Sequence, residues 1–100
     1  MGENKYLYKI TPQVDVSDNM SVQTKEIMGK HFLYLKDLHT KGKLLLAGPC
    51  LDREFGIAIF EAENLEQAEI IMNNDPCISE GVMKGELHPF RASLMRGVEA

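Results

Sequence analysis

The stretch from Leu44 to Glu61 constrains the fold more than any other part of the sequence. Two apolar runs, Leu44 to Ala47 and Ile57 to Phe60, flank a polar connector bounded by Gly48 and Gly56, a pattern typical of a β-hairpin. The second run does not alternate apolar with polar residues, so both faces of its strand require cover. We therefore expect this hairpin to form the centre of a sheet.

The rest of the chain predicts two helices and two further strands. The aromatic and β-branched run from Tyr6 to Ile10 predicts a first strand that stops before Pro12. Apolar residues recur at three- and four-residue spacing from Val22 to Thr40, which predicts a long helix. A second helix is expected over Ala62 to Asn74, and a last strand over Val82 to Leu87. The predicted order is therefore βαββαβ.

Local signals place the ends of the helices. Ser17, Asp18 and Ser21 are all candidates for the N-cap of the first helix, and Asn64 is the candidate for the second. Gly29 weakens the first helix by about 1 kcal/mol relative to Ala, and either close packing or simple tolerance explains its presence.

This order predicts an α+β, ferredoxin-like fold, in which a four-stranded antiparallel sheet carries two helices on one face. We expect one domain over residues 1–100, with a core from about 5 to 90 and a C-terminal tail over 91–100. The other face of the sheet is bare in a monomer. The apolar residues of the hairpin and of Tyr6 to Ile10 favour a homodimer that covers this face.

Composition excludes several classes of protein. The net charge is −4 and the basic residues are scattered, which argues against nucleic acid as a partner. No apolar run approaches the roughly 18 residues that span a membrane, and we expect no membrane partner and a cytoplasmic location. The two cysteines, Cys50 and Cys77, have neither the spacing nor the neighbours of a zinc site. We expect no metal and no cofactor.

His31 is a polar residue on an apolar helix face. At about 100° per residue it lies close to Ile27, Leu35 and Leu38, so it faces the sheet. A structural histidine that bonds a backbone group explains this position as well as a functional one does. His39 and His88, in contrast, fit surface positions.

Asp75 extends the inward stripe of the second helix, where a buried acid requires a partner. It also precedes Pro76, and a turn residue that bonds its own downstream backbone is the competing interpretation. Both helices lie on one sheet face, so His31 and Asp75 are able to meet. A carboxylate beside an imidazole fixes its tautomer and suits it to general acid or base catalysis.

Several motifs together resemble the YciI-like family of the dimeric α+β barrel superfamily. The resemblance runs from the first strand to about Phe90. Its pieces are the run Lys30 to Leu35, Gly42, the run Leu44 to Pro49, Glu61-Ala62-Glu63, Asn74-Asp75-Pro76 and Gly81-Val82.

The resemblance implies a ferredoxin-like subunit whose sheets pair face to face in a dimeric barrel, with an active site around His31 and Asp75. Activities in the family and superfamily include dehydrochlorination and isomerisation. The Gly48-Pro49 turn is expected to shape the rim of the pocket, with the Cys50 N–H facing a developing oxyanion. Cys77 stands where the family usually carries an aromatic residue, and we include its thiol among the candidate substrate-binding groups. The competing interpretation of either cysteine is an ordinary packing residue, since free Cys is among the most buried residue types.

Two functions follow from these observations. The first is a small-molecule lyase or isomerase that uses His31 as the acid or base and Asp75 to orient it, acting on a small oxygenated ring or keto compound. The second is a non-catalytic dimeric module that binds or senses a small molecule in the same pocket. A cleft lined by His31 and open to solvent separates both from a purely structural role.

Overall fold

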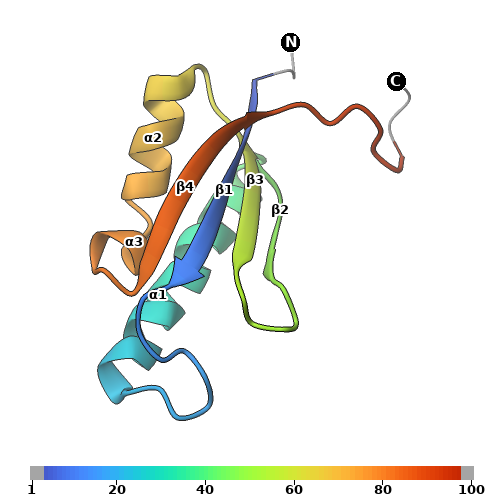
Figure 1. Ribbon diagram of the computed structural model, residues 1–100. Helices are drawn as coiled ribbons and strands as arrows, with labels where there is room; N and C mark the ends of the chain where they lie inside the picture. The colour runs from blue at the N-terminus through green and yellow to red at the C-terminus, as the bar shows by residue number, and fades with distance from the viewer. Residues whose placement is uncertain (1–3, 98–100) are drawn as a thin grey trace.

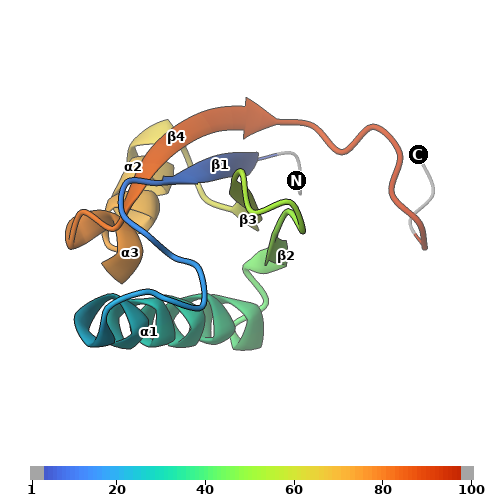
Figure 2. The same cartoon turned by 60° about the horizontal axis from the view of Figure 1, so that its bottom comes forward.

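Four antiparallel strands form one sheet in the order β2-β3-β1-β4, and the helices cover one of its faces (Figure 1, Figure 2). The computed structural model describes residues 4–97. The elements are β1 (Lys5–Pro12), α1 (Val22–Thr40), β2 (Leu44–Pro49), β3 (Gly56–Glu61), α2 (Leu65–Asn73), α3 (Pro76–Ser79) and β4 (Met83–Phe90). The ferredoxin-like βαββαβ order is confirmed, and the single turn α3 is an addition to it.

The β2–β3 hairpin does not form the centre of the sheet, so that prediction is wrong for β2. β3 pairs with both β1 and β2, whereas β2 is an edge strand. The reason is topological, because α1 carries the chain past the place beside β1, which β3 then occupies. The prediction that both faces of the second hairpin strand are covered is correct for β3. Its Ile59 is 8% exposed because Leu7 and Leu46 flank it on the face away from the helices.

The core lies between the sheet and the helices. Tyr6, Tyr8 and Ile10 of β1 are buried on the helix side, and the ring of Phe60 lies 5.5 Å from the ring of Tyr8 in an edge contact. The expected homodimer assigned the apolar residues of β1 to the free face. Alternation along the strand leaves only Leu7 of these for that face. The free face is therefore less apolar than the run suggests.

Helix ends follow the capping signals. Ser21, one of the three candidates, caps α1 by accepting a hydrogen bond from Thr24 N–H at 3.1 Å, and Gly42 follows the helix with a φ of +76°. Asn64 caps α2, as predicted, by accepting from Gln67 N–H at 2.8 Å. Among residues 4–97, none of the helices combines the length and apolar character that a membrane span requires.

The chain after β4 leaves the body of the molecule (Figure 1). His88 and Pro89, expected to close the last strand, lie within β4, where Pro89 is opposite Tyr6 on an edge strand that tolerates proline. Residues 91–97 contain no helix or strand longer than one bridge. Residues 98–100 of the predicted tail lie outside the described part of the chain.

Replacing Gly29 by Ala is expected to raise the free energy of unfolding by about 0.5–1 kcal/mol, because Ala restricts the unfolded chain and favours a helix. A Cβ atom at this position meets no described atom within 4 Å. Gly85→Ala is the contrasting variant, since its Cβ lies 2.7 Å from Ile78 Cδ1, and it is expected to destabilise the fold. Urea denaturation followed by circular dichroism measures both. A loss of stability in Gly29→Ala contradicts the prediction.

Candidate active site

Asp75 lies immediately before the one-turn helix α3 and caps it. Its Oδ1 accepts a hydrogen bond from the N–H of Cys77 at 3.1 Å, and Pro76 occupies the first helical position. The turn interpretation of the Asp-Pro pair is thus correct as far as the backbone is concerned. The same turn directs the carboxylate into the protein, where the residue is 0% exposed.

Two side chains from distant elements reach the same carboxylate. The Tyr8 hydroxyl, on β1, donates to Oδ2 at 2.8 Å. The Nδ1 atom of His31, on α1, lies 2.8 Å from both Oδ1 and Oδ2. A buried carboxylate is tolerated only when such partners are present. The structure therefore brings His31 and Asp75 together and adds Tyr8, which the sequence analysis did not single out.

The charge of Asp75 determines the proton positions around it. Burial raises the pKa of Asp75, but the hydrogen bond and charge of His31, with the hydrogen bonds from Tyr8 and Cys77 N–H, lower that pKa more, so it lies below the ordinary value. Asp75 is therefore an ionised acceptor at neutral pH. Nδ1 of His31 must then carry a proton, which leaves the lone pair of the neutral ring on Nε2.

His31 lies where the core-facing side of α1 meets its solvent-facing side. Its side chain is 12% exposed, which confirms the prediction that it faces inward. Leu38, two turns along the helix, is buried on the core side, whereas Leu35 and Met28 are only partly buried. His31 thus lies against the core on one side and is partly exposed on the other.

A cavity of about 970 Å³ opens beside His31, between α1, the loop before it and the β2–β3 hairpin. His31, Met28 and Leu35 line it from the helix. Its volume is at the upper end of the range of small-molecule sites. Asp75 does not line the cavity and lies behind His31. The arrangement is therefore a buried acid, an imidazole and an open cavity, in that order.

Three of the four predicted substrate-binding residues lie together at the end of β2 and directly after it. Gly48, Pro49 and Cys50 line the cavity, as expected. The N–H of Cys50 donates to the carbonyl of Phe55 at 2.8 Å, so the expectation that it faces an oxyanion is wrong. Hydrogen bonding across the hairpin connection uses that donor.

Cys77 does not line the cavity, so its predicted contact with substrate is wrong. It is 0% exposed, and both burial and the negative charge of Asp75 raise the pKa of its thiol. The capping turn explains this position, because it presents the Cys77 N–H to Asp75 and turns the residue into the core.

Two tyrosines are the parts of the site that sequence reasoning missed. Burial, together with the charge of Asp75, raises the pKa of Tyr8, so its hydroxyl remains a donor. The hydroxyl of Tyr34 donates to the carbonyl of Ile71 at 2.7 Å, which joins α1 to α2, and burial raises the pKa of Tyr34 to about 12. The alternation of residues in β1 indicates that Tyr8 faces inward. The sequence does not indicate its hydrogen-bond partner, Asp75, which lies 67 positions away.

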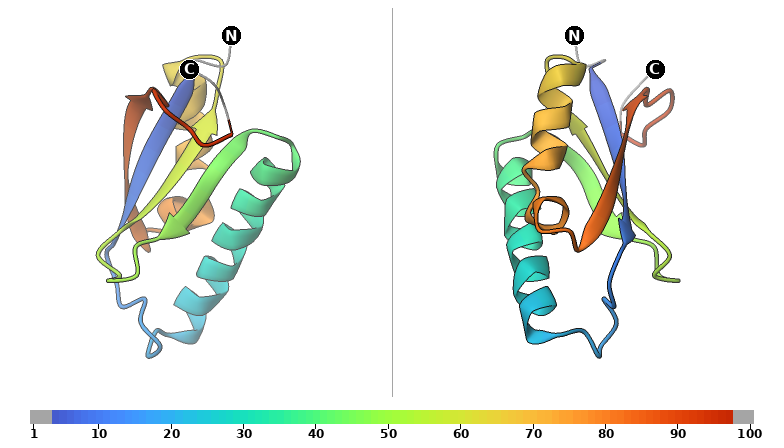
Figure 3. Two further views of the ribbon diagram at one scale, coloured as in Figure 1. Left: turned by 90° about the vertical axis from the view of Figure 1, so that its right-hand side faces the viewer. Right: turned by 60° about the vertical axis from the view of Figure 1, so that its left-hand side comes forward.

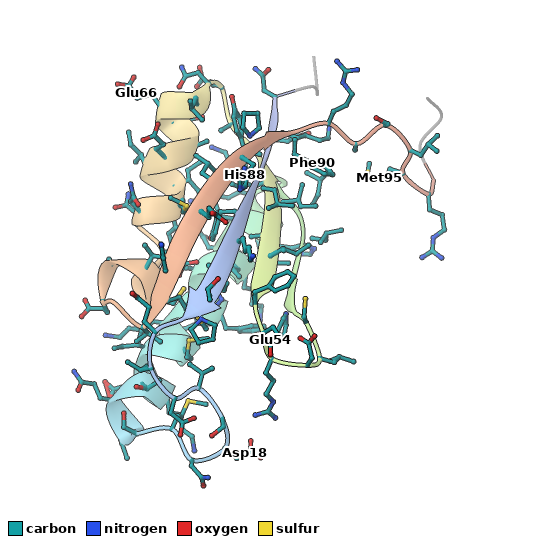
Figure 4. All side chains as sticks on the ribbon, viewed as in Figure 1. Asp18, Glu54, Glu66, His88, Phe90 and Met95 are labelled. Atoms are coloured by element: carbon teal, nitrogen blue, oxygen red, sulfur yellow. The ribbon has the colours of Figure 1, made fainter. Side chains whose placement is uncertain are left out.

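The other two histidines have different surroundings. His39 is exposed, as predicted, but it lines the cavity on the same helix as His31. His88 is exposed on β4, outside the cavity, with its Nε2 atom 3.8 Å from Glu86 (Figure 4). His88 therefore provides a histidine that is not part of the site.

His31, Asp75 and Cys77 offer possible ligand atoms within 4.8 Å of one another, which raises the question of a metal ion. The chemistry of these groups does not suit one. The oxygens of Asp75 already accept from Tyr8, His31 and the backbone, and a raised thiol pKa opposes the thiolate form that binds metals. The three groups form a hydrogen-bonded network instead.

Comparison with known proteins identifies the family. The YCII-related domain matches residues 7–91. The chain belongs to the YCII-related family. This match confirms the resemblance inferred from the motifs around His31, Gly48 and Asp75. Proteins with curated descriptions gave no sequence match.

Two solved structures share the fold of this YCII-related protein. One is the 5-chloro-2-hydroxyhydroquinone dehydrochlorinase of Burkholderia phenoliruptrix AC1100 in complex with 2,5-dihydroxybenzoquinone, with a TM-score of 0.61, 23% identity, and coverage of 85% of this chain and 93% of that one. The other is a muconolactone isomerase, with a TM-score of 0.72, 12% identity, and coverage of 96% and 99%. At these identities the likeness establishes the common fold.

The network makes the stability of the protein depend on pH. The pKa of Asp75 is lower in the folded state than in the unfolded chain, so its contribution is fully present above the ordinary pKa of about 4 and is lost as the pH falls through the folded value. Unfolding free energies from urea denaturation at a series of pH values from 6 to 2.5 are expected to fall more steeply for the natural protein than for Asp75→Asn. Parallel curves contradict this assignment.

Proposed function

We propose that the protein is a small-molecule enzyme of the lyase or isomerase type, in which His31 and Asp75 transfer a proton on an oxygenated ring or keto compound. One observation carries the proposal. His31 lines a cavity of about 970 Å³ while its Nδ1 atom lies 2.8 Å from both oxygens of a buried carboxylate. The fold it shares with a dehydrochlorinase and an isomerase adds support.

The proposed first step is removal of a proton from carbon. The Nε2 lone pair of His31 takes a proton from a C–H next to a carbonyl group, and the electron pair of that bond moves into an enolate. In an isomerisation, the imidazolium returns the proton to another carbon of the same compound. In an elimination, the enolate expels a leaving group with its electron pair, and the imidazolium passes the proton to solvent.

Asp75 has two roles in this proposal. Its hydrogen bond holds Nδ1 in the protonated form, which keeps Nε2 available as the base, and its negative charge stabilises the imidazolium that forms. Tyr8 positions the carboxylate from behind through its 2.8 Å hydrogen bond. Gly48, Pro49 and Cys50 form the opposite wall, where we place contacts with substrate.

The assignment predicts a large loss of turnover in His31→Gln. Removing the base is expected to lower kcat by at least about 100-fold on a compound that the natural protein converts, and Asp75→Asn to lower it by a smaller factor. The first compounds to test are 5-chloro-2-hydroxyhydroquinone and muconolactone, with exchange of carbon-bound hydrogen for solvent deuterium followed by NMR. Glu66→Gln, at an exposed position of α2 outside both the cavity and the free face of the sheet, is the control.

Nitrogen-15 NMR of the imidazole tests the tautomer without a substrate. The spectrum of the neutral ring is expected to show Nδ1 protonated and Nε2 bare. Nε2 protonation in the natural protein, or full turnover by His31→Gln, refutes the proposed mechanism. Tight binding of a compound with no exchange or turnover favours the alternative, a non-catalytic module that binds or senses a small molecule in the same cavity.

We also propose that the working unit is a homodimer joined through the free face of the sheet. Leu46, Ile59, Leu7 and His88 form one row across all four strands on that face, as the strand register shows. Leu46 is 50% exposed, and Phe90 on β4 is 37% exposed (Figure 4). The helices lie on the other side (Figure 3). A second sheet is the simplest cover for this row.

The dimer predicts a solution mass of twice the 11.3 kDa chain, measurable by light scattering. Leu46→Glu is expected to shift the protein toward the monomer, because it places a charge in the buried interface. Leu33→Glu is the control, since Leu33 is 62% exposed on α1 and lies away from the sheet. A monomeric natural protein, or equal effects of the two variants, contradicts the proposed interface.

A further inference from the structure

The cavity differs in charge from the rest of the molecule. The whole chain has a net charge of −4, with 15 acidic and 11 basic residues. The cavity is lined instead by two permanent cations, Lys36 and Arg53, against one carboxylate, Asp18, with His31, His39 and Cys50 as the other titratable groups. A basic cavity in an acidic protein favours a negatively charged occupant.

Lys36 reaches the cavity from the same helix as His31. It lies five residues further along α1, a rise of about 7.5 Å, and is exposed at the rim. The carboxylate next to it in sequence, Asp37, is engaged by Lys41 at 2.9 Å. Because His31 and Lys36 both line the cavity, an occupant that fills it can place one part near His31 and an anionic group near Lys36.

Arg53 reaches the cavity from the opposite side, at the tip of the β2–β3 connection. Its φ of +66° places it in the left-handed region, which non-glycine residues adopt at a cost. Its pair with Asp18 is loose, at 3.8 Å, and the two side chains are 59% and 96% exposed. Such a pair contributes little. The turn accounts for the backbone of Arg53, whose N–H donates to the Cys50 carbonyl at 2.9 Å, and the loose pair leaves its guanidinium available to an occupant of the cavity.

The remainder of the lining is apolar. Met20, Met28 and Met83 line the cavity, and methionine adapts to irregular ligands. Phe32 and Leu51 line it too, although they are 64% and 96% exposed. Exposed apolar side chains at a cavity rim favour an occupant with an apolar body.

We propose that the compound bound in this cavity is an organic carboxylate with a ring system, whose negative charge is attracted by Lys36 and Arg53 at the rim and whose ring lies along Met28 and Leu35, with its reacting carbon toward His31. This inference names the substrate class of the proposed enzyme and rests on that function for the reaction. Binding of the anion does not require turnover. A binding measurement therefore tests this inference separately from the proposed reaction.

The experiment compares 2-naphthoate with 2-naphthamide, which have the same ring system but differ in charge. Chemical-shift changes in the nitrogen-15 spectrum of the intact protein give both affinities. We expect the acid to bind more tightly, with shifts around the cavity, and to lose its advantage as salt rises from 20 to 500 mM. Lys36→Gln is expected to weaken the acid by about two- to five-fold and leave the amide unchanged. Lys30→Gln, on α1 outside the cavity, is the control.

Arg53→Gly separates recognition from structure. Glycine adopts the left-handed conformation freely, so this variant is expected to be more stable than the natural protein while binding the acid less tightly. A purely structural Arg53 predicts no change in the preference for acid over amide. His31→Gln is expected to keep the preference for the acid. If the natural protein binds the acid but converts no compound, the proposed reaction is refuted while the inference about binding stands. Equal affinity for acid and amide, or unchanged preference in both Lys36→Gln and Arg53→Gly, overturns the inference.

Discussion

The carboxylate of Asp75 is the interaction on which both the fold and the candidate site depend. It is 0% exposed and accepts hydrogen bonds from Tyr8, His31 and the Cys77 backbone, and so it joins β1, α1 and α3. Loss of one donor leaves a buried charge with fewer partners, which costs more than the bond itself contributes. The group that orients the imidazole is therefore also a group that holds the helices on the sheet.

The two interpretations of Asp75 that the sequence left open are both correct, because a carboxylate has two oxygens. Oδ1 caps α3, as a turn residue before proline should, and Oδ2 accepts from Tyr8, while Nδ1 of His31 lies 2.8 Å from each. The cap fixes the side chain without using all of its acceptor capacity. Local backbone chemistry thus places the acid, and the tertiary fold supplies its partners.

The sequence predicted what periodicity and local chemistry determine. Spacing along α1 placed His31 inward, Asn64 was identified as a cap, and the element order gave the fold. It did not predict the partner of Tyr8 or the edge position of β2, since each depends on how elements distant in sequence pack. The cavity was beyond reach for the same reason, because a void is a property of packed surfaces and leaves no pattern in the chain.

Helix α1 combines two functions because its faces meet different surroundings. Leu38 faces the core, Leu35 and Lys36 face the cavity, and His31 lies between them. This division also accounts for how an acidic protein is able to bind the proposed anionic compound. At physiological ionic strength, charges beyond about 8 Å are largely screened, so an occupant responds to the rim of the cavity and only weakly to the net charge of the chain. Lys36 and Arg53 line that rim, whereas Asp75 is separated from the cavity by His31. The imidazole of His31 therefore lies between the negative charge of Asp75 and an occupant of the cavity.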